Sequence, residues 1–157
     1  MKRSIVGILA ISLVLLTGCG EKEVSASADN LPTVTTNQGE APTISAPSGT
    51  PPATLVTKDI IVGTGAEALP TSTMTVHYTL MTWSNGALVE SSWNGGSPTT
   101  CPLSNVIVGW QEGIPGMKVG GRRLLVIPPD IGYGAQGSGP IGPNETLIFV
   151  VDAIGVA

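Results

Sequence analysis

A strict alternation of side-chain character near the middle of the chain constrains the fold more than any other feature. Between Met74 and Leu80 the even-numbered residues are apolar or aromatic, and the odd-numbered residues are threonine or histidine. A period of two is typical of a strand with one buried face, so we predict a half-buried strand with His77 on its wetter face. Asn85-Gly86 follows and favours a tight hairpin, because both residues tolerate positive φ. The returning strand is expected over residues 88–93.

Only one stretch has a helical period. From Ser104 to Ile114 the large apolar residues fall on one face, Ser104 can cap the first turn, and Pro115-Gly116 end the pattern. Two more strands are predicted at 122–128 and 146–154, and the second is so apolar that a central place in a sheet is expected. A long glycine-rich loop joins them. We therefore predict an α+β fold, in which a curved antiparallel β-sheet wraps around one short α-helix.

Charge and cysteine content exclude several functions. The net charge is −4 at pH 7, whereas a nucleic-acid partner requires a basic surface. His77 is the only histidine of the chain and the sequence has no acidic cluster to join it, so no metal site is predicted. We interpret Cys101 as a small buried apolar residue, because a thiol nucleophile would need a neighbouring base.

The amino terminus carries the signals of an exported lipoprotein. Met1-Lys2-Arg3 is positively charged, and residues 5–16 form an apolar run too short to span a bilayer. Leu16-Thr17-Gly18-Cys19 resembles a bacterial lipobox. We predict a lipoprotein signal peptide at 1–18 and a diacylglycerol-modified Cys19 that holds the protein on the outer face of the cell membrane, or on the outer membrane of a two-membrane cell. The alternative is an ordinary signal peptide with an incidental cysteine.

Two further regions follow the signal peptide. Residues 19–53 are rich in Ser, Thr, Ala and Pro and poor in aromatic residues, which predicts a flexible, disordered linker behind the lipidated cysteine. Residues 54–157 contain every predicted strand and the helix, and we assign them to one folded domain.

This domain resembles the FKBP family of prolyl isomerases over nearly its whole length. The shared motifs occur in the family's order, which makes coincidence implausible. They are Val76-His77-Tyr78-Thr79, Ser84-Asn85-Gly86, Glu90-Ser91-Ser92, residues 106–113, residues 116–123, Ile127-Pro128-Pro129, Gly132-Tyr133-Gly134-Ala135 and residues 143–149.

The resemblance implies a monomeric enzyme that isomerises Xaa-Pro bonds in proline-containing segments of proteins folding outside the cytoplasm. It implies no cofactor, because an apolar pocket acts by desolvation and by preferential binding of the twisted amide. The residues implied to act on the substrate are Tyr78, Glu90, Ile107, Trp110, Tyr133 and Phe149. The residues implied to complete the substrate-binding wall are Val89, Val106 and Ile141.

The sequence also departs from the family's pattern. Val89-Glu90 stands where an aromatic residue followed by aspartate is usual, and Thr99 and Cys101 replace aromatic residues. Each lost aromatic contact is worth about 0.5–1.5 kcal/mol beyond its area. We therefore expect weakened turnover and only weak binding of macrolide ligands. A low-activity or non-catalytic proline-peptide binding or chaperone module on the membrane is the main alternative, and a purely structural surface lipoprotein is a more distant one.

Overall fold

The computed structural model describes residues 30–157 of the chain. The signal peptide predicted at 1–18 and the lipidation predicted at Cys19 lie outside these residues. No helix between residues 30 and 157 has the length and apolar character needed to cross a membrane.

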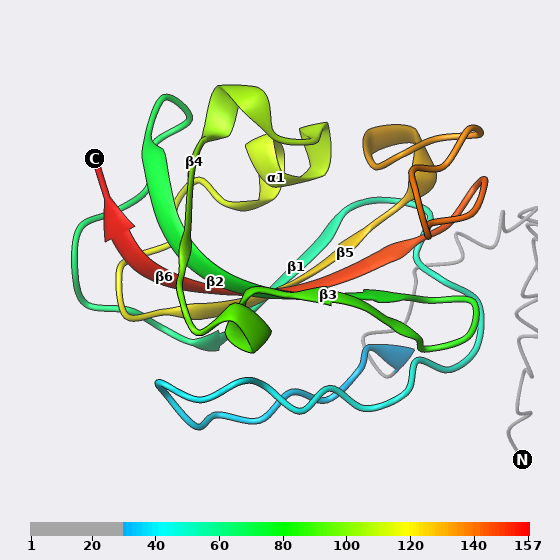
Figure 1. Cartoon of the computed structure of the whole chain (residues 1–157), viewed down its shortest axis with the longest axis horizontal. Helices are drawn as coiled ribbons and strands as arrows, with labels where there is room; N and C mark the ends of the chain where they lie inside the picture. Colours follow the sequence, from blue (N-terminus) through cyan, green and yellow to red (C-terminus); the bar gives the residue numbers. More distant parts are fainter. Residues whose placement is uncertain (1–29) are drawn as a thin grey trace, which may run out of the picture.

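One antiparallel sheet of six strands forms the body of the described chain (Figure 1). The strand order is β1-β5-β6-β2-β3. β4 and β3 both pair with the side of β2 that faces away from β6: β4 pairs with its first residues, 73–76, and β3 with residues 79–81. The strands are β1 (Val56–Ile61), β2 (Thr73–Thr82), β3 (Leu88–Ser91), β4 (Thr99–Pro102), β5 (Arg122–Ile127) and β6 (Leu147–Val156). The helical segments are α1 (Val108–Gly113) and three 3-10 turns, η2 (Ser92–Gly95), η3 (Leu103–Asn105) and η4 (Pro129–Ile131).

The predicted α+β architecture is confirmed, with β6 at the centre of the sheet. β2 forms where the alternation predicts a strand, but it is not half-buried: from Val76 to Thr82 every residue except Tyr78 is buried, because both faces of the strand are covered. The hairpin after it turns at Gly86, whose φ is +64°. The pattern did not reveal β1, whose middle residues are exposed and lack alternation. β1 is an edge strand, so only one of its sides must match a neighbour.

The helix is shorter than predicted, and the expected cap at Ser104 is wrong. The Ser104 hydroxyl bonds to Asn105 Oδ1 at 3.3 Å, and it belongs to the 3-10 turn η3. Val106 and Ile107 then adopt extended backbone, with ψ of 172° and 151°, so the helical path is interrupted. α1 begins only at Val108. The interruption has a consequence for the site, because it leaves the Ile107 amide outside the helix.

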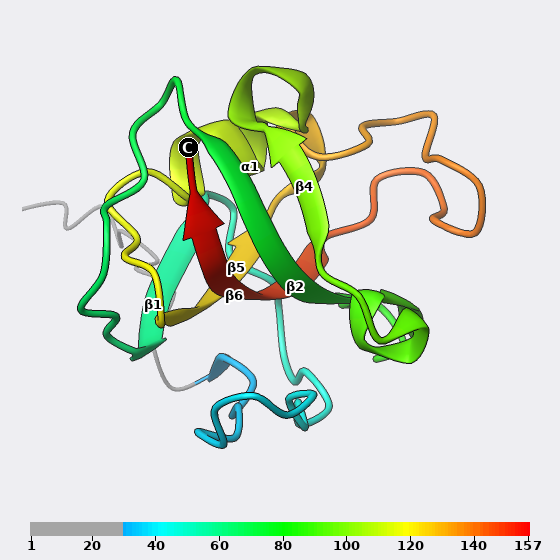
Figure 2. The ribbon, with the colours of Figure 1, turned by 60° about the vertical axis from the view of Figure 1, so that its left-hand side comes forward.

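The main core lies between α1 and the inner face of the sheet (Figures 1 and 2). Glycines allow the helix to sit directly on β5. A methyl group on Gly109 would overlap the Ile127 side chain, and one on Gly113 would meet Leu125. The main core consists of Met74, Val76, Leu80, Leu103, Trp110, Ile114, Met117, Leu125, Ile127, Leu147, Phe149, Val151 and their neighbours.

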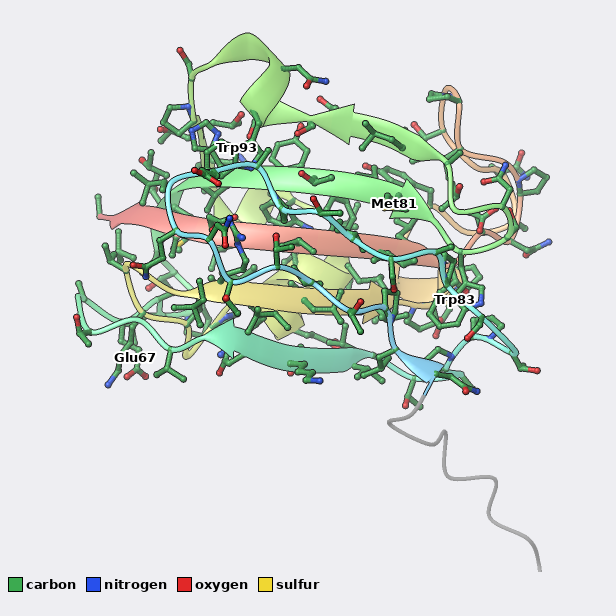
Figure 3. All side chains as sticks on the ribbon, turned by 90° about the horizontal axis from the view of Figure 1, so that it is seen from below. Glu67, Met81, Trp83 and Trp93 are labelled. Atoms are coloured by element: carbon green, nitrogen blue, oxygen red, sulfur yellow. The ribbon has the colours of Figure 1, made fainter. Side chains whose placement is uncertain are left out.

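The outer face of the sheet is covered by residues 30–53, which we call the N-terminal arm (Figure 3). The predicted disordered linker therefore does not extend to residue 53. Val34 and Ile44 of the arm pair as an isolated antiparallel bridge, and with Leu31 they pack on a second apolar cluster. That cluster is made of Met81, Trp83, Leu124, Val126, Ile148 and Val150. The arm and this cluster form a second core.

Hydrogen bonds to backbone carbonyls fix the arm in place. The side chain of Arg122 is fully buried, and its guanidinium donates to Asp152 Oδ1 at 2.7 Å, to Thr35 O at 2.9 Å and to Glu40 O at 2.7 Å. The Trp83 indole donates to Gly49 O at 3.1 Å. A charged donor that reaches two carbonyls of an irregular segment can order that segment even when its own apolar content is low.

His77 lies on the outer face as predicted, but it is buried rather than wet. Its ring stacks on Trp93 with a centroid separation of 4.0 Å, and Nδ1 lies 2.9 Å from Ser92 Oγ. The turn η2 therefore covers His77, which the alternating pattern had predicted to face solvent. His77 has a structural environment on the face opposite to the helix.

Candidate active site

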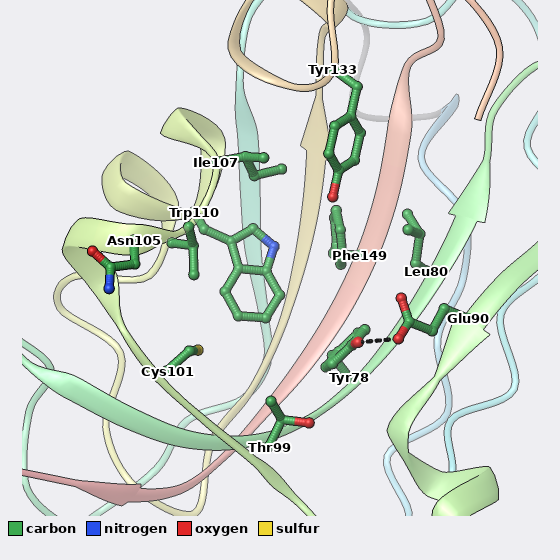
Figure 4. Close-up of a pocket in the computed structure, with 11 residues that line it drawn as sticks. Tyr78, Leu80, Glu90, Thr99, Cys101, Asn105, Ile107, Trp110, Tyr133 and Phe149 are labelled. Atoms are coloured by element: carbon green, nitrogen blue, oxygen red, sulfur yellow. Dashed lines mark hydrogen bonds between the residues drawn. The ribbon is translucent and has the colours of Figure 1, made fainter. Parts of the chain in front are cut away.

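A cavity of about 390 Å³ opens between the inner face of the sheet and the start of α1 (Figure 4). We call it the main pocket. Four strands (β2, β3, β4 and β6), the η3–α1 segment and the loop after η4 supply its walls. Its lining residues are Tyr78, Leu80, Glu90, Thr99, Cys101, Asn105, Val106, Ile107, Trp110, Tyr133 and Phe149.

Trp110 forms the floor of the main pocket. Its side chain is 5% exposed and stands edge-on to Phe149, with a centroid separation of 5.3 Å, and to Tyr78 at 5.8 Å. Perpendicular aromatic rings of this kind pack favourably and hold each other in place. The indole N–H is buried and has no hydrogen-bond partner among residues 30–157. The floor is therefore an aromatic plate that is held by its neighbouring rings and carries one unpaired N–H.

Tyr78 and Glu90 form a hydrogen-bonded pair on the opposite wall. The Tyr78 hydroxyl donates to Glu90 Oε1 at 2.6 Å, and the two residues come from the neighbouring strands β2 and β3. Burial raises the pKa of the Tyr78 phenol well above its ordinary value, and the hydrogen bond and the charge of Glu90 raise it further. Tyr78 thus stays protonated and keeps donating to the carboxylate.

Tyr133 enters the main pocket from the loop that follows η4. Backbone hydrogen bonds brace this loop: Gly134 N–H donates to Pro129 O at 2.8 Å and Asn144 N–H to Gly134 O at 2.9 Å. Burial raises the pKa of the Tyr133 phenol, and the negative charge of Glu90 adds to the effect. The hydroxyl finds no hydrogen-bond partner within residues 30–157. A protonated, unpaired donor therefore points into the pocket, as Figure 4 shows.

The amide of Ile107 is a second free donor. The carbonyl of Ile107 accepts from the Trp110 and Gln111 N–H groups of the first helical turn, but its own N–H makes no bond in the described part of the chain. This follows from the extended backbone just before α1. The two donors and the indole floor surround one apolar volume.

The structure brings most of the predicted site residues together. Tyr78, Glu90, Val106, Ile107, Trp110, Tyr133 and Phe149 all line the main pocket, as do Thr99 and Cys101. Val89 and Ile141 do not. They line an adjoining cavity of about 310 Å³, the side pocket, which shares Leu80, Glu90 and Tyr133 with the main pocket.

Sequence reasoning missed two lining residues. Leu80 follows Tyr78 by two positions in β2, so the period of two could have identified it. Asn105 left no comparable signal, because its position depends on the interrupted helix start.

The chemistry open to the main pocket is narrow. The lining offers no base beside the Cys101 thiol, whose pKa is raised by burial, so this thiol stays protonated and poorly nucleophilic. No group of three or more His, Cys, Asp or Glu residues able to hold a metal ion occurs in residues 30–157. The arrangement suits the binding of a compact apolar ring over Trp110, with nearby carbonyl groups held by the Ile107 amide and the Tyr133 hydroxyl.

Comparisons with known proteins agree with this picture. The family described as FKBP-type peptidyl-prolyl cis-trans isomerase matches residues 65–154. A Corynebacterium glutamicum protein named "Probable FK506-binding protein" is 50% identical over 115 residues, which are 73% of this chain and 98% of the relative. An FK506-binding protein of Streptomyces anulatus is 46% identical over 121 residues, 74% of this chain and 98% of the relative. The crystal structure of AtFKBP13 superimposes with a TM-score of 0.60 at 36% identity, over 66% of this chain and 93% of that one.

Proposed function

The chain belongs to the family of FKBP-type peptidyl-prolyl cis-trans isomerases and is an enzyme of that class, and from this premise we propose how its main pocket accelerates the reaction. Rotation about a peptide bond must break amide resonance, which costs about 18–20 kcal/mol. The twisted amide has less charge separation than the planar one, so an apolar, desolvated pocket stabilises it relative to the ground state. This chemistry requires neither a nucleophile nor a metal ion.

The substrate proline ring lies over Trp110 in this proposal. The Ile107 N–H and the Tyr133 hydroxyl donate to two substrate carbonyl groups, which hold the peptide while the bond rotates. The single observation that carries the proposal is the pair of unbonded donors above a buried indole. Tyr78 and Glu90 shape the side nearest the rotating amide, and Phe149 supports the indole from its edge.

The wall made by β4 limits the expected efficiency. Thr99 and Cys101 supply little apolar area there, and Val89 is turned toward the side pocket. A smaller apolar wall leaves more water around the substrate amide, which weakens preferential binding of the twisted form. We expect macrolides of the kind that family members bind to associate weakly for the same reason.

Isomerisation of a set of Xaa-Pro peptides, measured by NMR exchange, tests the proposal. Tyr133→Phe removes one neutral hydrogen bond and should lower kcat/KM by about 2- to 10-fold. Trp110→Ala removes the floor and should abolish acceleration, provided that its circular dichroism spectrum shows it is folded. Glu112→Gln on the exposed side of α1 is the matched control and should change neither result.

If the wild-type chain accelerates no peptide, catalysis is rejected. Peptide-dependent quenching of tryptophan fluorescence, lost in Trp110→Ala, would then support the binding-module alternative. If neither turnover nor peptide binding is detected, both readings of the main pocket fail.

We also propose that the protein is exported and lipid-anchored through Cys19. The supporting features are the basic residues 2–3, the apolar run 5–16 and the Leu16-Thr17-Gly18-Cys19 motif. The position of the arm adds a geometric limit. Eleven peptide steps join Cys19 to the first described residue and reach at most about 40 Å when fully extended. An anchored domain would therefore act on proline-containing segments of proteins close to the membrane surface.

Metabolic labelling with radioactive palmitate tests the anchor. Label should enter the wild-type protein and be lost in Cys19→Ala, which should also leave the membrane fraction. Label that persists in Cys19→Ala would contradict the proposal, whereas Cys101→Ala serves as the control that should keep the label.

A further inference from the structure

We propose that Glu90 makes this enzyme prefer substrates with a long cationic side chain, lysine or arginine, directly before the proline. The inference rests on the proposed isomerase site and names a substrate class for it. It follows from the shape and charge of the two cavities that meet at Glu90.

Glu90 is the only charged residue that lines either cavity. The remaining lining of the main pocket is apolar, hydroxyl, thiol or amide, and the side pocket adds Val89, Ser138, Gly139, Pro140 and Ile141. Because Glu90 belongs to both linings, it stands at their junction. A peptide that fills the main pocket with its proline therefore places a neighbouring residue within reach of this carboxylate.

The carboxylate has a free acceptor. The Tyr78 hydroxyl donates to Oε1 at 2.6 Å, and no hydrogen bond to Oε2 occurs within residues 30–157. Glu90 is exposed, and Figure 4 shows its carboxylate directed toward the space between Tyr78 and Tyr133. Its charge also contributes to the raised pKa of the Tyr133 phenol, so its field extends across the pocket mouth.

The residue before the proline is the one best placed to meet this charge. Tyr78 and Glu90 border the side on which the amide rotates, and that amide joins the preceding residue to the proline nitrogen. The side chain of that residue can enter the side pocket, where Leu80, Val89 and Ile141 offer an apolar wall. Lysine and arginine combine an apolar stem with a charged tip, so the stem can lie on this apolar wall while the tip reaches the carboxylate at the junction of the two cavities.

No positive charge in the described chain competes for Glu90. Lys58, Lys118, Arg122 and Arg123 are the basic residues of this part, and none of them lines either cavity. Three of the four are already paired, with Glu67, Asp152 and Asp59. The field at the pocket mouth is therefore negative, which favours cationic peptides and disfavours acidic ones.

Peptides that differ only before the proline test the inference. One carries lysine, one carries Nε-acetyl-lysine, which keeps the stem and removes the charge, and one carries glutamate. Because Glu90 is exposed, the charge should raise kcat/KM for lysine over acetyl-lysine by about two- to fivefold. Glutamate should be the poorest of the three. The lysine advantage should shrink as salt is raised from 0.05 to about 1 M, since screening shortens the reach of an exposed charge.

Two variants separate the pocket charge from the overall charge. In Glu90→Gln the lysine to acetyl-lysine ratio should fall to about one, and a ratio cancels any general loss of activity. Glu112→Gln removes a charge from the outside of α1 and should leave the ratio unchanged. A matching set with lysine after the proline should show a smaller advantage.

The outcomes distinguish the inference from the function on which it rests. A wild-type ratio near one with measurable turnover of all peptides overturns the inference and leaves the isomerase proposal intact. A ratio that survives Glu90→Gln, or an advantage confined to lysine after the proline, also overturns it. Absence of turnover for every peptide, including the uncharged ones, defeats the proposed function itself and the inference with it.

Discussion

Replacing Arg122 by methionine should destabilise the protein more than any comparable change of surface charge. The guanidinium is fully buried and makes three hydrogen bonds, one to Asp152 and two to carbonyls of the N-terminal arm. Methionine has a similar length but no charge. The substitution therefore leaves the Asp152 carboxylate buried without a counter-charge and leaves two arm carbonyls without their donor.

The cost can be worked from these contacts. Removing one partner of a buried ion pair costs about 3–5 kcal/mol, against a total stability of about 5–15 kcal/mol for a domain. Lys118→Met is the control, because Lys118 and Glu67 form an exposed pair at 3.9 Å that should contribute at most about 1 kcal/mol. Urea denaturation at constant protein concentration gives both free energies of unfolding.

The pH dependence of the loss has a defined sign. Burial raises the pKa of the Asp152 carboxyl above its ordinary value even though Arg122 opposes the shift. Without Arg122 the folded-state pKa should rise further above the unfolded one. The variant is then least destabilised below about pH 3, where the carboxyl is protonated in both states. The loss grows as pH rises towards the folded-state pKa, by up to about 1.4 kcal/mol per unit.

Two combined variants identify the source of the loss. Replacing both partners, as in Arg122→Met with Asp152→Leu, should recover most of the stability because no buried charge is left unpaired. Deleting residues 30–53 should reduce the cost of Arg122→Met, since water can then reach Asp152. If Arg122→Met lowers the free energy of unfolding by less than about 1 kcal/mol at pH 7, or by the same amount with and without the arm, then Arg122 is not the buried residue that holds the arm on the sheet.

Further predictions concern the packing and ionisation of the site. Gly109→Ala should destabilise the protein by about 1–3 kcal/mol, because the added methyl overlaps Ile127, and this outweighs the preference of alanine for helices. Urea denaturation measures the loss. Ile127→Val in the same chain should recover part of it. The value of kcat/KM should stay level from pH 7 to about 9, because the raised pKa values of Tyr78 and Tyr133 keep both phenols protonated there; a fall that begins below pH 9 would contradict this. Cys101 should react slowly with iodoacetamide at pH 7.5, because burial raises the pKa of its thiol, and labelling as fast as that of free cysteine would contradict the assigned environment.

Short-range patterns determined a large part of the fold. The period of two gave β2, Asn85-Gly86 gave the hairpin, and the apolar run ending near Ile154 gave the central strand. These features depend on residues close together in the chain, so they can be read without knowing the partners. The site residues were predicted from the resemblance to the FKBP family, and Val106, Ile107 and Trp110 lie within one of the shared motifs.

Tertiary structure decided where the helix begins and what the side pocket contains. The extended backbone at Val106 and Ile107 shortened the predicted helix and freed the Ile107 amide. Val89 and Ile141 were expected in the wall of the pocket over Trp110, yet they line the side pocket, which shares only Leu80, Glu90 and Tyr133 with the main pocket. Such positions depend on how distant segments meet, which local spacing does not encode.

The N-terminal arm shows most clearly which features the local sequence predicts and which depend on tertiary contacts. By itself the composition of residues 30–53 indicates disorder. The segment is held on the sheet by packing on the second apolar cluster and by hydrogen bonds from Arg122 and Trp83, which lie 34 to 87 residues away in the chain. One signal was present in the sequence. Leu124 and Val126 of β5, like Ile148 and Val150 of β6, place apolar side chains on the outer face, so that face needed a cover. The sequence by itself determined that both faces of the central strands are apolar. Only the tertiary structure decided that residues 30–53 bury the second face, because a guanidinium that binds backbone carbonyls leaves no side-chain pattern in the segment it holds.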